Sequence, residues 1–105
     1  MAYYTPLHHV TIQLIDDEVF YGEKKISQKL SPQERQVLKK LAEKPGKIIT
    51  HDQLAKILWR QKADEKFSLW AITKIVEKIR RKIRLLGINH QLIITIYGKG
   101  YQLTE

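Results

Sequence analysis

The most regular hydrophobic pattern of the chain lies between Ser68 and Leu86, in the stretch SLWAITKIVEKIRRKIRLL. Its apolar residues recur at alternating steps of four and three, a period that predicts an α-helix with one buried face. These residues are Ile72, Val76, Ile79, Ile83 and Leu86, with Leu69 and Ile75 on the flanks. At about 100° per residue, the opposite side of this helix presents mainly basic side chains and one large aromatic ring. They are Trp70, Lys74, Glu77, Lys78 and Arg81, with Thr73, Arg80 and Arg84 along one edge.

A basic helix face of this kind has three interpretations. It can be solvated, it can lie on a membrane surface, or it can bind a negatively charged partner. The apolar stripe is narrow and is needed for a domain core, which disfavours the interpretation as a membrane-surface helix. The choice between the other two interpretations depends on the rest of the sequence.

The N-terminal third shows the alternation typical of short strands. His9 to Ile15 alternates apolar and polar residues, and Val19 to Tyr21 and Lys25 to Gln28 predict a second and a third strand, joined at Gly22-Glu23. The acidic triplet 16–18 between the first two strands can form a turn or, less typically, a metal site. Residues 1–30 therefore predict an antiparallel sheet.

Two capping boxes mark the starts of two further helices. Ser31 and Glu34 begin a helix that runs to about Glu43 and buries Val37, Leu38 and Leu41, before Lys44-Pro45-Gly46 stops it. After an extended link at Ile48-Ile49, Thr50 and Gln53 begin a helix that buries Leu54, Ile57 and Leu58 and ends near Trp59. Arg60 to Lys66 is a polar loop, and Gly87 ends the long basic helix, so residues 31–87 predict a three-helix core.

The C-terminal stretch predicts a β-hairpin over residues 91–104. Leu92 to Tyr97 is rich in β-branched residues, and Gly98-Lys99-Gly100 separates it from Tyr101 to Leu103. Two strands around a glycine-flanked lysine give a hairpin with a basic tip.

Composition supports one small domain with an excess of positive charge. The chain has 105 residues, a formal net charge of +8 and no cysteine. Residues 1–34 hold three basic and five acidic side chains, whereas residues 35–105 hold sixteen basic and six acidic ones. Such an excess favours a polyanionic partner. We find no secretory signal peptide and no apolar run long enough to span a bilayer, so a cytoplasmic location is expected.

Catalytic and metal-binding patterns are poorly represented. The histidines at positions 8, 9, 51 and 90 lack the helical i, i+4 spacing of a zinc site, and Gly98-Lys99-Gly100 is too short for a phosphate-binding loop. We therefore expect no enzyme, no cofactor, no metal and no small-molecule ligand.

The order of the predicted elements indicates an α+β winged helix-turn-helix. A sheet is followed by two helices, a long basic helix and a hairpin with a cationic tip. A major groove about 12 Å wide accepts one α-helix, and the hairpin can reach the adjacent minor groove. Lysine and arginine supply attraction to phosphates, and those at the helix centre can donate to guanine acceptors.

At this point the sequence resembles the OmpR/PhoB-type winged-helix DNA-binding domains of bacterial transcription regulators, from about Lys29 to Leu103. Its landmarks are LSPQERQVLKKLAEKPGKIITHDQLAKILW, then IRRKI at 79–83 and TIYGKGYQL at 95–103. The resemblance implies an N-terminal sheet of about four strands, with Tyr3 and Tyr4 in the fourth. It also implies that a phosphorylated receiver domain of a two-component system often precedes such a domain; a stand-alone regulator or a membrane-anchored, ToxR-like one is the alternative.

The resemblance carries DNA contacts onto particular positions. Trp59 and Thr95 match positions that touch the DNA backbone, Arg80 matches a basic position beside the groove, and Lys74 and Lys78 face base edges. The full expected set for base reading is Lys74, Lys78, Trp70 and Arg81. The expected set for the DNA backbone and the wing is Trp59, Arg80, Arg84, Thr95, Tyr97 and Lys99.

Several positions depart from the family pattern. Trp70 stands where arginine is usual, Ile75 where histidine is common, Glu77 where the residue is often basic or small, and Tyr97 where arginine is frequent. Trp59 can also be a core residue, Trp70 can fold back onto the preceding loop or contact a protein, and Tyr101 is expected in the core.

Two functions therefore remain open. The first is sequence-specific binding of double-stranded DNA, with head-to-tail pairing on direct repeats and contact with RNA polymerase through Arg60 to Lys66, as the resemblance implies. The second is a protein-interaction winged helix with weak or non-specific DNA binding, anchored by Trp70.

Overall fold

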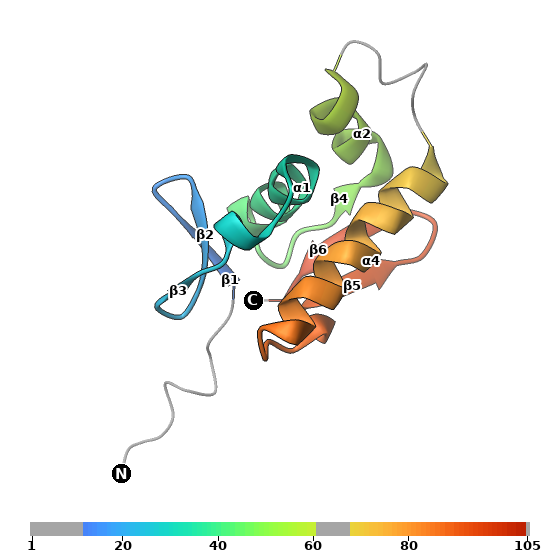
Figure 1. The fold of residues 1–105 in the computed structure, drawn as a ribbon. Helices are drawn as coiled ribbons and strands as arrows, with labels where there is room; N and C mark the ends of the chain where they lie inside the picture. Colours follow the sequence, from blue (N-terminus) through green and yellow to red (C-terminus); the bar gives the residue numbers. More distant parts are fainter. Residues whose placement is uncertain (1–11, 61–67, 105) are drawn as a thin grey trace.

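The computed structural model describes residues 12–60 and 68–104, which form three α-helices and two three-stranded antiparallel sheets (Figure 1). The elements follow one another as β1 (Ile12–Ile15), β2 (Glu18–Tyr21), β3 (Lys24–Lys25), α1 (Pro32–Glu43), β4 (Ile49–Thr50), α2 (His51–Trp59), α4 (Leu69–Leu85), β5 (Ile93–Ile96) and β6 (Gly100–Leu103). Short 3-10 helices occupy Ser27–Lys29 and His90–Leu92. This order confirms the predicted α+β winged helix-turn-helix.

The N-terminal sheet has the strand order β1-β2-β3. A two-residue turn joins β1 to β2, and both of its residues, Asp16 and Asp17, have positive φ angles of 51° and 66°. A two-residue turn with positive φ at both central positions has a backbone twist that matches the twist of the two strands it joins. The Asp17 carboxylate lies 2.8 Å from the Lys39 ammonium of α1. Asp16 and Asp17 of the acidic triplet therefore form a turn, as one of its two interpretations predicted, while Glu18 is the first residue of β2.

The third strand is shorter than predicted. The predicted strand spans Lys25 to Gln28, but β3 ends at Lys25 and a 3-10 helix begins at Ser27. The chain turns inward here, because Ile26 is fully buried and its N–H donates to the Val19 carbonyl at 2.9 Å. The buried Ser27 hydroxyl donates to the Glu18 carboxylate. The expected fourth strand at Tyr3 and Tyr4, and the start of the first strand before residue 12, lie outside the described residues.

The first two helices begin at the predicted capping boxes, and α4 begins just after Ser68, the first residue of its predicted stretch. Ser31 Oγ accepts from the Glu34 N–H at 3.2 Å, while the Glu34 carboxylate accepts from the Ser31 N–H at 2.9 Å. Thr50 and Gln53 form the same reciprocal pair at 3.1 and 2.9 Å. Ser68 caps α4 by accepting from the Ala71 N–H. Each side chain satisfies a backbone donor that the first helical turn leaves unpaired.

The C-terminal sheet has the order β4-β6-β5, and its third strand, β4, consists of Ile49 from the predicted extended link and of Thr50, the cap of α2. Ile49 pairs with Tyr101 and Thr50 with Gly100, while β5 and β6 form the predicted hairpin, called the wing below. The first strand of the wing begins at Ile93 and not at Leu92, which lies in the preceding 3-10 helix.

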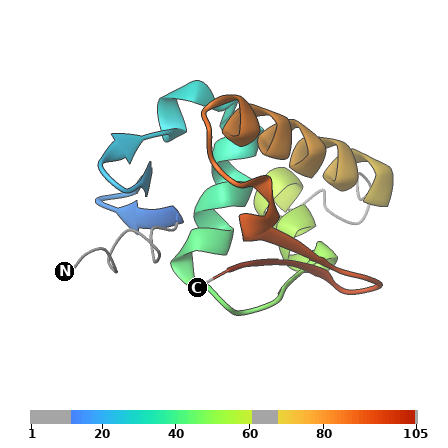
Figure 2. The same ribbon diagram turned by 90° about the horizontal axis from the view of Figure 1, so that it is seen from below.

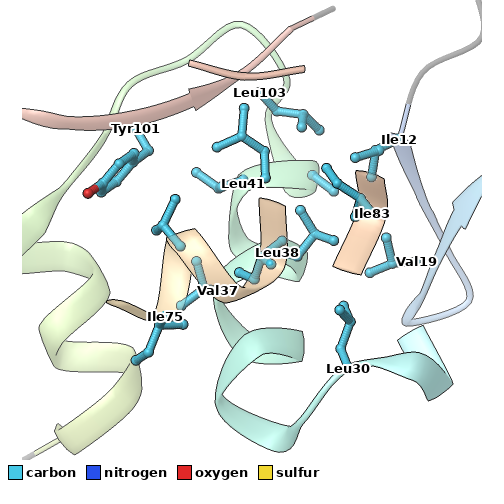
Figure 3. Close-up of a cluster of buried hydrophobic side chains, with 14 of the residues drawn as sticks. Ile12, Val19, Leu30, Val37, Leu38, Leu41, Ile75, Ile83, Tyr101 and Leu103 are labelled. Atoms are coloured by element: carbon cyan, nitrogen blue, oxygen red, sulfur yellow. The ribbon is translucent and has the colours of Figure 1, made fainter. Parts of the chain in front are cut away.

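Helix α1 lies between the N-terminal sheet on one side and α4 with the C-terminal sheet on the other (Figures 1 and 2). Its buried residues Val37, Leu38 and Leu41 meet side chains from all of these elements (Figure 3). The predicted core stripe of α4 is confirmed at its centre by four buried residues, Ile72, Val76, Ile79 and Ile83, whereas Leu86 is only half-buried. Burial of α4 along this stripe fixes which of its side chains face outward.

Candidate nucleic-acid interface

The outer face of α4 is exposed over its whole length and is mostly basic. We define it by Trp70, Lys74, Glu77, Lys78, Arg81 and Arg84, all of which are exposed. The Trp70 side chain is 70% accessible, and the Lys74 ammonium lies 5.6 Å from the centre of its ring. Lys74 also lies 3.4 Å from the Glu77 carboxylate. The side chains predicted to read bases are therefore on one accessible surface.

Arg80 has partners within the fold that sequence reasoning missed. Its Nη2 donates to the Ile93 carbonyl at 2.7 Å and to Thr95 Oγ1 at 2.9 Å, and its guanidinium lies 5.8 Å from the Tyr101 ring. These contacts fasten α4 to the outer edge of β5. Because the partners are distant in sequence and include a backbone carbonyl, no local pattern could have identified them.

Lys82 is the second basic residue of α4 that contacts another element of the fold. Its ammonium lies 2.7 Å from the carboxylate of Glu34, whose side chain is only 6% exposed. Burial raises the pKa of this carboxyl, but the hydrogen bond and charge of Lys82, together with the Ser31 N–H, hold the pKa below its ordinary value. Glu34 thus completes the capping box of α1 and also forms an ion pair with α4.

One cleft separates α4 from the wing. It encloses about 280 Å³ and is lined by Thr73, Glu77 and Arg80 on the helix and by Thr95 and Tyr97 on the wing. The Tyr97 side chain is 90% accessible, and Lys99 is exposed beside it. Tyr101 is buried, with the His51 ring packed edge-on against it at 5.6 Å, which confirms its predicted place in the core.

A second cleft lies on the opposite flank of α4, toward α1 and α2. It encloses about 390 Å³ and is lined by Trp59, Trp70, Lys74 and Lys78, with Gln33 and Ile75. Trp59 is half-buried against the core and also lines this cleft, so the core interpretation is confirmed without removing it from the surface. The loop onto which Trp70 could fold, residues 61–67, lies outside the described residues.

The arrangement is a convex, positively charged helix with a cleft on each side and a hairpin that projects beside it. The N-terminal half of α4 and the tip of the wing lie on the same side of the molecule (Figures 1 and 2). Within residues 12–60 and 68–104, no group of His, Cys, Asp and Glu side chains is placed to hold a metal ion. None of the helices described is long and apolar enough to cross a bilayer. His8 and His9 are outside these ranges.

Known proteins are similar to this chain in sequence and in fold. Residues 24–103 match the family described as transcriptional regulatory protein, C terminal. The sensory transduction protein BceR of Halalkalibacterium halodurans is 38% identical over 77 residues, which cover 72% of this chain and 32% of BceR. The chain therefore spans about a third of the length of this relative.

Two solved structures share the fold. The DNA-binding domain of the response regulator AdeR, in complex with an intercistronic region, superposes with a TM-score of 0.67 at 21% identity, covering 98% of both chains. The C-terminal domain of the nisin resistance regulator NsrR gives a TM-score of 0.64 at 24% identity, covering 90% of this chain and 93% of that one. By its family match, the chain belongs to the OmpR/PhoB-type C-terminal domains of transcriptional regulatory proteins, the DNA-binding effector domains of transcription regulation.

Proposed function

We propose that the chain binds double-stranded DNA sequence-specifically, with α4 in the major groove and the wing at the adjacent minor groove. The observation that carries this proposal is the exposed basic outer face of α4 beside the projecting wing. A helix with its side chains is about 10–12 Å across and a major groove is about 12 Å wide, so α4 can enter it. The two clefts then lie where the two sugar–phosphate strands that border the groove would pass.

The residues divide by their place on this surface. Lys74, Lys78 and Arg81 at the centre of the outer face are proposed to donate to base edges, with Trp70 in apolar contact near the start of α4. Backbone contacts are proposed for the residues that border the clefts or lie at the wing, namely Trp59, Arg80, Thr95, Tyr97 and Lys99, and for Arg84 near the end of the outer face of α4. A guanidinium has five N–H donors, so Arg80 can hold the wing through Nη2 while its other nitrogens face a phosphate.

Selection of bound duplexes from a random pool, followed by salt titration of the selected duplex, tests this function. Neutralisation of about four to six phosphates predicts a slope of log K against log salt of roughly −4 to −5. We expect one enriched motif and this slope. Absence of any enriched duplex, or binding that does not respond to salt, would contradict the proposal.

A protein-interaction function is the second candidate, because the exposed Trp70 ring borders the cleft toward α2. Tryptophan is favoured at the centres of protein interfaces. Co-purification of a partner that Trp70→Ala displaces, with DNA binding unchanged, would favour this candidate. Lys74→Ala and Lys78→Ala distinguish the two candidates. If these lysines read bases, each substitution should reduce the affinity for the selected site more than the affinity for random DNA.

The remaining assignments follow from the family and from the resemblance. We propose that the domain acts in the bacterial cytoplasm without catalysis, cofactor or small-molecule ligand, and that it pairs head to tail on direct repeats. Contact with RNA polymerase is proposed for Arg60 to Lys66, of which the structure describes only Arg60. Analytical ultracentrifugation on duplexes with one or two copies of the selected motif tests the pairing.

A further inference from the structure

Glu77 is the one acidic residue of α4, and it lies in the middle of the outer face. Its side chain is 55% exposed and borders the cleft toward the wing. The Lys74 ammonium is 3.4 Å away, one helical turn earlier. Thr73 and Arg80 face the same cleft, while Arg81 is exposed one turn later on the outer face.

The pair of Lys74 and Glu77 has little to do with stability. Both side chains are about half exposed, and water screens ion pairs of this kind so strongly that they contribute little to folding. Both groups therefore remain available to a ligand. Replacement of Glu77 should leave the fold intact, which makes its role in binding measurable.

A carboxylate in this position repels the phosphates of DNA, so its favourable partner has to be a hydrogen-bond donor. The donors that bases present in the major groove are the N4 amino group of cytosine and the N6 amino group of adenine. The adenine amino group lies between two acceptors, N7 of the same base and O4 of thymine, and both repel a carboxylate. The cytosine amino group has acceptors only on the guanine side.

The donor and the acceptor that α4 presents at Lys74 and Glu77 are complementary to the acceptors of guanine and the donor of cytosine in one G·C base pair. Lys74 offers a donor for guanine O6 or N7, and Glu77 beside it offers an acceptor for cytosine N4. On the basis of the proposed binding of DNA by α4, we infer that Glu77 determines the base specificity. Its carboxylate accepts a hydrogen bond from a cytosine N4 amino group, while Lys74 donates to the guanine paired with that cytosine.

Duplex selection with the wild-type chain, Glu77→Ala and Glu77→Gln tests this inference. We expect the wild-type motif to contain a required cytosine, and Glu77→Ala to lose roughly 5- to 150-fold of discrimination at that position, the effect of one good base contact. Glu77→Gln should shift the preference at this position to adenine, because an amide can donate to N7 and accept from N6.

The chain offers a matched control in Glu43→Gln. The pair of Lys40 and Glu43 on α1 has the same i, i+3 spacing and the same 3.4 Å separation, but it borders a different cleft, which Asp17 and Lys39 also line. Glu43→Gln should leave the selected motif unchanged, and urea unfolding of all variants confirms that they are folded.

The outcomes separate this inference from the function on which it rests. A wild-type chain that enriches no motif overturns both. A wild-type motif that persists unchanged in Glu77→Ala and Glu77→Gln overturns the role of Glu77 and leaves the DNA-binding function standing. The same holds if both variants bind all duplexes more tightly by one common factor, because Glu77 would then act only through its charge.

Discussion

At the scale of single residues, the basic side chains of α4 divide into two groups with different tasks. Arg80 and Lys82 have partners in β5 and α1, at 2.7 Å in each case, whereas Lys74, Lys78, Arg81 and Arg84 are exposed. Composition alone would predict that all six side chains contact a polyanion. The division arises because the flanks of α4 face other elements and only its outer face meets solvent.

Arg80→Ala should destabilise the domain through loss of the two hydrogen bonds to Ile93 and Thr95. A part-buried bond to a charged group contributes about 1.5–3 kcal/mol, and urea unfolding measures the loss as a lower midpoint. Arg80→Lys should recover only part of it, because an ammonium lacks the planar fork. Arg81→Ala, on the outer face, serves as the control and should stay within about 0.5 kcal/mol. Equal effects at both positions would show that the bonds to the wing contribute nothing.

Acid should weaken the domain through Glu34. Its folded-state pKa is below the ordinary value of 4.5, so its contribution to stability is complete above about pH 4.5 and is lost as pH falls through the folded value. Glu34→Gln keeps the side-chain acceptor of the capping box but removes the charge. Urea unfolding at pH 7 and at about pH 3 should show a smaller pH-dependent loss in this variant than in the wild type. An identical loss in both proteins would mean that other carboxyl groups account for the acid sensitivity.

At the scale of elements, local sequence signals predict the features that depend on neighbouring residues, such as the starts of helices. Ser31 and Thr50 cap helices at the predicted places because a cap is complete within four residues. The sequence indicates the short β4 only as an extended link. A two-residue strand is too short to show a hydrophobic period, and its partner β6 lies half the chain length away in sequence. The contacts of Arg80 and Lys82 escaped prediction for the same reason, because their partners lie in elements that only the fold brings near.

Gly100→Ala should open the contact between β4 and β6. A Cβ atom at Gly100 would lie 2.0 Å from the Ile49 carbonyl oxygen and 2.8 Å from the Thr50 Cα, and neither backbone atom can move without disrupting the sheet. We expect a loss of about 3 kcal/mol or more, at the upper end of overpacking.

Gly98→Ala is the matched control for this substitution. A Cβ atom there would meet no other atom within 4 Å, and only the positive φ of 79° opposes it, at about 1–2 kcal/mol. Thermal or urea unfolding should therefore rank Gly100→Ala as the more destabilising of the two. The reverse order would show that the close approach of β4 is dispensable for stability.

At the scale of the whole molecule, charge is separated along the fold. The N-terminal third has more acidic than basic side chains, and its sheet lies on the far side of α1 from α4 and the wing (Figure 1). The basic residues of α4 and of the wing tip gather on the other side. Such a distribution orients the domain as it approaches a polyanion, because the attraction acts before any contact forms.

Two single-lysine variants test whether this separation governs binding. Lys99 is exposed at the wing tip, and Lys25 is exposed in β3 of the N-terminal sheet, so each substitution by alanine removes one surface charge. Lys99→Ala should weaken binding to the selected and to random duplexes by about the same factor and make the salt slope shallower by roughly one. Lys25→Ala should leave both affinity and slope unchanged, although the net charge falls equally. If fluorescence anisotropy shows the same loss for both, net charge and not the placement of the wing beside α4 determines affinity.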